Sequence, residues 1–74
     1  MMKKKSIGSI LRELRGNKSR AEVAKAVGVS TSAIAMYELD ERIPRDDVKV
    51  RIAHYYGKPV ATIFFANEVH DMRD

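Results

Sequence analysis

The sequence predicts an all-α fold, with five short helices in one compact domain. Apolar residues recur at helical spacing in five segments, and a capping serine, an aspartate or a proline precedes each segment. Glycines at positions 16, 28 and 57 follow three of the segments, where a left-handed residue would end a helix. The chain has 74 residues, 45% of them hydrophobic, which suffices for one small core. We expect the domain to span residues 6–66, between a flexible basic arm at residues 1–5 and a tail at residues 67–74.

The first helix is predicted from residue 7 to about residue 15, with Ser6 as its N-cap. Its apolar stripe follows the i, i+3, i+4, i+7 pattern of a helix with one buried face. The stripe consists of Ile7, Ile10, Leu11 and Leu14. Arg15 continues this stripe at i+8, so its side chain either extends past the helix end or meets a carboxylate. Turn-forming residues follow at positions 16–18.

Two further helices are predicted at residues 20–27 and 31–39, with Ser19 and Ser30 as their N-caps. Gly28 forms the hinge between them, because glycine enters the left-handed region without steric cost. Two helices joined by a short turn that contains glycine form the helix-turn-helix pattern. That pattern places its second helix in the major groove of DNA.

The helix at residues 31–39 has two different sides. Ala33, Ile34 and Tyr37 gather on the side expected to face the core, with Glu38 at its edge. The other side carries small and mostly uncharged residues, which is unusual for a simple solvated surface. Its members are Thr31, Ser32, Ala35, Met36 and Leu39. Such a side suits a helix that another molecule approaches closely.

The last two helices follow a polar connection that Pro44 ends. Asp46 is expected to cap the fourth helix, which reaches Tyr56, and Gly57 ends it. Its expected core residues are Val48, Ile52, Tyr56 and part of Ala53. Pro59 opens the fifth helix at residues 60–65. Its shared apolar face consists of Val60, Ile63 and Phe64, and Phe65 points elsewhere.

The net charge of +4 is unevenly distributed along the chain. Residues 1–25 carry eight Lys and Arg against two Glu, a balance of +6, whereas residues 26–74 have a balance of −2. The basic third could meet a polyanion, although a solubilising basic surface would show the same charge.

Several classes of function are disfavoured. The chain has no cysteine for a disulfide or a thiolate metal site, and no apolar run of the ~18 residues that a membrane span requires. Its first residues lack the apolar region of a signal peptide, so we expect a soluble, cytoplasmic protein. His54 and His70 have no second cluster of ligands at useful spacing, which argues against a metal. No catalytic nucleophile–base pattern or phosphate-binding glycine loop occurs, so we expect neither an enzyme nor a cofactor.

The residues from 23 to 38 form the motif V-A-x-x-x-G-V-S-x-x-x-I-x-x-Y-E. After it come Arg42, Ile43 and Pro44, then Ile52, Ala53, Gly57, Ile63 and Phe64. The order and spacing of these residues resemble the Cro/CI-type (XRE) family of helix-turn-helix DNA-binding regulators, over about residues 7–64. The resemblance implies a lambda-repressor-like fold and, as partner, double-stranded DNA.

Three positions depart from the family pattern. The family usually has glutamine at the start of the second helix, where this chain has Arg20, which can meet a phosphate but cannot also accept a hydrogen bond. Asp40 replaces a glycine after the third helix, a change that aspartate tolerates better than most residues. The turn between the first two helices is shorter than usual.

The resemblance also implies which residues would contact DNA. The expected base contacts are Thr31, Ser32, Ala35 and Met36, and the expected backbone contacts are Lys18, Arg20, Ser30, Arg42 and Arg45. The first set lacks the Arg, Asn and Gln side chains that discriminate bases best, so methyl contacts, water and DNA shape should share in the specificity. Alternatively, the outer side of the third helix packs on another protein, and the charged residues are only solvated.

Two structural contacts are expected as well. Arg15 and Glu38 match a pair that bridges the first and third helices in relatives, so we expect a partly buried salt bridge; the alternative is two unrelated surface charges. A homodimer contact is expected around Phe65 and Val69, with Val50 as a further exposed apolar residue.

The resulting hypothesis is a sequence-specific transcriptional regulator, by family habit a repressor, that binds a palindromic operator as a homodimer and has no evident small-molecule site. It would act in the cytoplasm of a bacterium or come from a phage. The alternatives are an antitoxin or controller-type regulator, and a protein-interaction module that keeps the fold without binding DNA.

Overall fold

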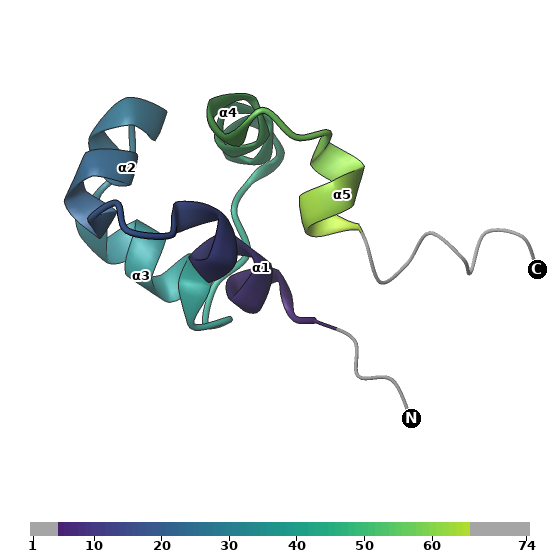
Figure 1. The fold of residues 1–74 in the computed structure, drawn as a ribbon, viewed down its shortest axis with the longest axis horizontal. Coiled ribbons are helices and arrows are strands. Elements are labelled where there is room, and N and C mark those ends of the chain that lie inside the picture. Colours follow the sequence, from purple (N-terminus) through teal and green to yellow (C-terminus); the bar gives the residue numbers. More distant parts are fainter. Residues whose placement is uncertain (1–4, 66–74) are drawn as a thin grey trace, which may run out of the picture.

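The computed structural model describes residues 5–65, which form five α-helices (Figure 1). The helices are α1 (Ile7–Arg15), α2 (Arg20–Val27), α3 (Thr31–Glu38), α4 (Asp46–Tyr56) and α5 (Val60–Phe64). The expected all-α architecture is confirmed, and each helix end lies within one residue of its expected position. α3 packs against α2 and α1, α4 packs against α2 and α5, and α5 closes the domain against α1. Within residues 5–65, no helix has the length and apolar character that crossing a membrane requires.

The first three helices begin at the expected serine caps. The hydroxyl oxygens of Ser6, Ser19 and Ser30 each accept a hydrogen bond, at 3.0 Å, from the backbone N–H three residues further on. Each cap satisfies one of the backbone donors that the first turn of a helix leaves unpaired. Local sequence therefore decides where these helices start.

The expectation for the start of α4 was wrong by one position. Arg45 takes the N-cap position and makes no side-chain cap hydrogen bond, whereas Asp46 is the first helical residue. The Asp46 carboxylate lies 3.6 Å from Lys49 Nζ, one turn further along. Its charge still suits the positive end of the α4 dipole, which explains why the sequence pattern resembled a cap.

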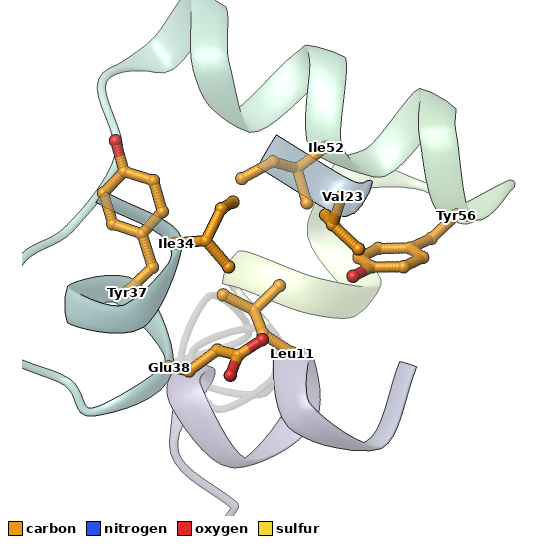
Figure 2. Close-up of a pocket in the computed structure, with 7 residues that line it drawn as sticks. All are labelled: Leu11, Val23, Ile34, Tyr37, Glu38, Ile52 and Tyr56. Carbon is orange, nitrogen blue, oxygen red and sulfur yellow. The ribbon is translucent and has the colours of Figure 1, made fainter. Parts of the chain in front are cut away.

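The core lies between all five helices. Its buried apolar residues are Leu11, Val23, Ala24, Val27, Ile34, Tyr37, Val48, Ile52, Ala53, Ile63 and Phe64. Ala53 is completely buried, and not only in part as expected, whereas Tyr56 is half-buried. Tyr56 lines a small cavity at the edge of the core together with Leu11 and Glu38 (Figure 2), so its polar end stays near the margin.

Candidate nucleic-acid interface

The turn between α2 and α3 sets the direction of α3. Gly28 adopts the left-handed conformation with φ 89°, and its N–H donates to the Ala24 carbonyl at 2.8 Å. Val29 N–H donates to the same carbonyl at 3.0 Å, and Arg51 Nε donates to the Val27 carbonyl at 2.9 Å, so two of the last carbonyls of α2 are satisfied. Ser30 then starts α3 immediately. This geometry is the helix-turn-helix arrangement that the sequence predicts.

The outward face of α3 carries the four residues expected to contact bases. Thr31 and Ser32 are exposed at the N-terminal end, and Ala35 and Met36 are partly exposed one turn further on. The hydroxyls of Thr31 and Ser32 make no hydrogen bond within residues 5–65, so both can donate or accept toward a ligand. Leu39 is 53% exposed and extends the same face with an apolar side chain. We call the first four residues the readout face.

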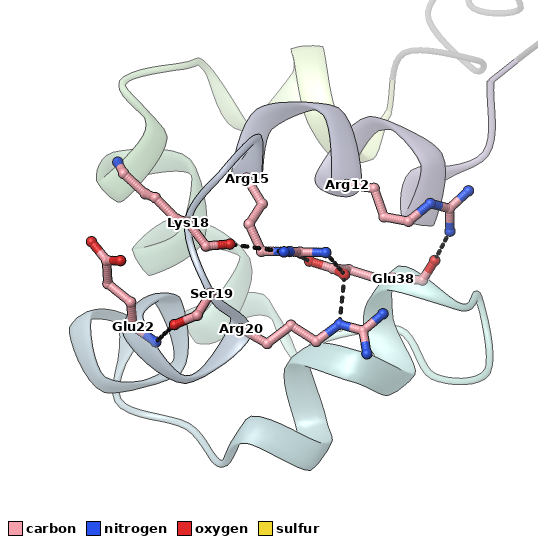
Figure 3. Close-up of polar contacts among 7 residues, drawn as sticks. All are labelled: Arg12, Arg15, Lys18, Ser19, Arg20, Glu22 and Glu38. Atoms are coloured by element: carbon pink, nitrogen blue, oxygen red, sulfur yellow. Dashed lines mark hydrogen bonds and ion pairs between the residues drawn. The ribbon is translucent and has the colours of Figure 1, made fainter.

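The C-terminal end of α3 is fixed by a buried carboxylate. Glu38 is only 1% exposed, deeper than its expected place at the edge of the helix side. Its carboxylate oxygens meet Arg15 Nε at 2.7 Å, Arg15 Nη2 at 3.1 Å and Arg20 Nε at 3.0 Å (Figure 3). The structure therefore brings Arg15 and Glu38 together, and it adds Arg20, which sequence reasoning did not assign to this contact.

Two guanidinium groups explain how Glu38 can be buried. An isolated buried carboxylate is costly, and the negative end of the α3 dipole raises that cost. The hydrogen bond to Glu38 raises the pKa of Arg15, which keeps this cation charged. Burial, and then the charge of Glu38, raise the pKa of Tyr56 to about 12, so its hydroxyl stays protonated. A paired buried carboxylate of this kind costs little while both partners remain, and much when one is removed.

A second clamp joins the start of α1 to the end of α3. Asp40 has a φ of 62°, and its Oδ1 accepts the Gly8 N–H at 2.9 Å. A hydrogen bond from the Ser6 side chain and that from the Gly8 backbone lower the pKa of Asp40. Arg12 Nη1 donates to the Glu38 carbonyl (Figure 3). Sequence reasoning missed this clamp, and its only signals were a glycine near the start of an amphipathic helix and an aspartate in a glycine position.

Arg20 and Lys18, both expected to grip phosphates, point in different directions. Arg20 is 38% exposed, and only its Nε binds Glu38; its terminal nitrogens are directed away from that carboxylate (Figure 3). They remain available for a phosphate. Lys18 Nζ lies 5.0 Å from the centre of the Tyr55 ring on α4, and its side chain diverges from Arg20.

The remaining expected backbone contacts lie beside α3. Ser30 is exposed, but its hydroxyl already accepts the Ala33 N–H as the cap. Arg42 and Arg45 are exposed on the loop after α3 and line one groove there. The Nε of Arg45 lies 4.0 Å from a carboxylate oxygen of Asp47, a distance that leaves the guanidinium accessible.

The expected dimer residues and histidines lie elsewhere. Phe65 is 38% exposed, with Lys49 Nζ 5.0 Å from its ring centre, and Val69 lies outside the described residues. His54 is exposed on α4, and His70 also lies outside the described residues. Among residues 5–65, no group of three or more His, Cys, Asp or Glu side chains is placed to hold a metal ion.

One comparison with known proteins gives a match. The family model HTH_3, described as a helix-turn-helix, matches residues 10–63, which run from the middle of α1 into α5 and include the whole of α2 and α3. The searches of curated proteins and of solved structures give no match. The resemblance stated from the sequence, and the five-helix fold that it implies, are confirmed by this match.

Proposed function

Because the chain belongs to the HTH_3 (Cro/C1-type) helix-turn-helix family, we propose that it binds double-stranded DNA sequence-specifically, with α3 in the major groove. One observation carries this proposal. On the readout face Thr31 and Ser32 are exposed and Ala35 and Met36 are partly exposed, while the inner side of the same helix is buried and the ion pairs of Glu38 fix its C-terminal end. A helix held rigidly on one side and bare on the other can enter a groove without any change in the domain.

Base recognition in this proposal falls to the readout face. Thr31 and Ser32 hydroxyls can bond to either kind of base-edge group, and Ala35, Met36 and the threonine methyl can contact thymine methyls. Since no side chain here makes a bidentate contact, DNA shape and bridging water supply part of the specificity.

Backbone binding falls to cations beside α3. The terminal nitrogens of Arg20 and the exposed Arg42 and Arg45 suit phosphates, and Ser30 adds the start of α3. Lys18 belongs to this set only if its side chain leaves the Tyr55 ring. Each phosphate contact makes the slope of log K against log salt more negative by about 0.9.

The regulator acts, in this proposal, as a cytoplasmic repressor and as a homodimer on a palindromic operator. One readout face covers one half-site, and two-fold related copies would read two half-sites about 34–36 Å apart. Exposed Phe65 and Val50, with Val69 beyond the described residues, are the proposed dimer contacts.

The test is selection of bound sequences from a random DNA pool, followed by salt titration on the selected site and on unrelated DNA. We expect a palindromic consensus, a steep salt slope on both DNAs, and tighter binding to the selected site. If no sequence is enriched and no steep salt slope is seen, the chain is a protein-interaction module on this fold.

A further inference from the structure

A groove runs along one flank of α3, between the turn at residues 28–29 and the loop that precedes α4. Its polar groups come from Tyr37, Arg42 and Arg45, with Arg51 from the middle of α4. Its apolar lining consists of Gly28, Val29, Ala33, Ile43 and Val48. We call this groove the flank groove.

Three side chains of the flank groove carry hydrogen-bond donors that are not used for hydrogen bonds within the described part of the domain. The Tyr37 ring is buried, with the residue 7% exposed, but its hydroxyl points away from Leu11 and Glu38 (Figure 2). Neither this hydroxyl nor the Arg42 side chain makes a hydrogen bond within residues 5–65. Arg45 has only its distant contact with Asp47. A concave site with a hydroxyl and two guanidiniums suits an anion, and the exposed Asp47 carboxylate, 4.0 Å from Arg45 Nε, only partly offsets their charge.

Arg51 does not add a free charge to this site. Its Nε donates to the Val27 carbonyl at 2.9 Å, and its Nη1 lies 3.4 Å from Asp47. Arg51 instead joins α4 to the C-terminal end of α2, on one side of the flank groove. The anion-binding groups are therefore Tyr37, Arg42 and Arg45.

The flank groove lies next to the readout face. Ala33 and Tyr37 form an i, i+4 row on α3, and the adjacent row is Ser32 and Met36. On the other flank lies Glu38 with Arg20. The two sets of cations thus stand on opposite sides of one helix. The major groove of B-DNA is about 12 Å wide and is bordered on each side by a phosphate backbone, so a helix that lies in it meets one backbone on each flank.

We propose that the flank groove binds a phosphate of the DNA backbone and that the Tyr37 hydroxyl donates a hydrogen bond to it. This proposal rests on the proposed function and adds Tyr37 as a positioning contact on the backbone opposite to that met by Arg20. The buried ring holds the hydroxyl in place before DNA arrives, so binding orders little at this side chain. The contact fixes the depth and rotation of α3 and carries no base information itself.

The decisive variant is Tyr37→Phe, which keeps the buried ring and removes only the hydroxyl. Tyr55→Phe is its matched control, because Tyr55 lies on α4, away from the flank groove. We expect Tyr37→Phe to weaken binding about tenfold on every DNA sequence, the loss of one hydrogen bond to a charged group. Base preference should stay unchanged, and so should the salt slope, since a neutral donor releases no counterion. Arg42→Gln should instead make that slope less negative by about 0.9.

A second measurement locates the phosphate on the DNA; its wild-type arm needs no variant, and its second arm repeats the binding with Tyr37→Phe. Duplexes of the selected site carry one neutral methylphosphonate at a time. At one phosphate position per half-site, the methylphosphonate and Tyr37→Phe should each weaken binding, and both changes together should weaken it no more than either alone. Equal affinities of Tyr37→Phe and wild type, or purely additive losses at every position, would overturn the contact. Thermal melting separates these results from misfolding, because a correctly folded Tyr37→Phe variant should have the melting temperature of the wild type.

Two further outcomes separate the sources of phosphate. If inorganic phosphate at matched ionic strength stabilises wild type but not Tyr37→Phe, while both bind DNA equally, the site takes a free anion and the DNA assignment is wrong. If wild type binds no DNA at all, the proposed function and this inference both fail. If wild type binds and only the Tyr37→Phe effect is missing, the inference alone fails.

Discussion

The two ends of α3 are held in different ways. At the C-terminal end, the Glu38 side chain meets two arginines, and its backbone carbonyl accepts from Arg12 of α1. At the N-terminal end, Ile34 packs in the apolar core, and the only side-chain hydrogen bond among the described residues is that of the Ser30 cap, which is local. The domain thus fixes the position of α3 from one end and leaves the readout face without structural duties.

This difference separates stability from recognition along one helix. Substitutions at the anchored end should change the free energy of unfolding, and DNA binding should follow from that change. Substitutions on the readout face should change DNA binding alone. Four predictions, from the largest expected effect on stability to the smallest, test this separation.

Glu38→Gln should cost about 3–5 kcal/mol in unfolding free energy, because Arg15 and Arg20 would keep their charges without the carboxylate. Urea unfolding followed by circular dichroism measures the loss. Glu41→Gln is the control, since Glu41 is exposed and should change stability by no more than about 0.5 kcal/mol. Equal stabilities of the two variants would show that the anchored end is not structural.

Gly8→Ala should destabilise by about 1–3 kcal/mol, although alanine normally favours a helix over glycine by about 1 kcal/mol. A Cβ at this position would stand 2.7 Å from the carbonyl carbon of Glu38 and 2.9 Å from Asp40 Oδ2. The melting temperature of Gly8→Ala relative to wild type shows which effect is larger: a decrease means that the steric clash outweighs the helix propensity of alanine. A more stable Gly8→Ala would mean that α1 and α3 are not in close contact.

Asp40→Asn should lower stability at neutral pH, and this loss should vanish in acid. The pKa of Asp40 is lower in the folded than in the unfolded protein, so its stabilising effect is complete above the unfolded pKa of about 4. The effect disappears as the pH falls through the folded pKa. Unfolding free energies of wild type and Asp40→Asn, measured from pH 7 to pH 2, should therefore converge at low pH. Curves that stay parallel would assign the difference to backbone conformation at φ 62° instead.

Ser32→Ala should leave the unfolding free energy within about 0.5 kcal/mol of wild type and change which bases are tolerated. Site selection with the variant protein measures the second effect. Arg42→Gln is the comparison, since it should weaken binding to all sequences equally. If Ser32→Ala also weakens all sequences equally, this residue does not read bases.

Sequence reasoning succeeded where the information is local. Ser6, Ser19 and Ser30 mark helix starts because each caps a backbone group only three residues away. Asp46 was misplaced by one residue because an acidic side chain suits both the cap and the first turn. The contact of Arg15 with Glu38 was expected from resemblance to relatives, whereas the position of Arg15 on the first helix left two outcomes open.

The contacts that sequence reasoning missed are those between distant segments. Arg20 was assigned to phosphate alone, because nothing in the sequence shows that its Nε reaches Glu38, 18 residues away. Gly8 and Asp40 are 32 residues apart, and their contact depends on how α1 crosses the end of α3. Such contacts follow from the packing of the finished domain, so only the structure reveals them.

The local support of the readout face bears on how this domain can diversify. Since the Ser30 cap needs only the Ala33 N–H, positions 31, 32, 35 and 36 can change together without a compensating change in the core. Duplicated copies could therefore drift toward separate target sites while sharing one scaffold. Randomising these four positions in a library should yield mostly folded proteins with mutually independent preferences.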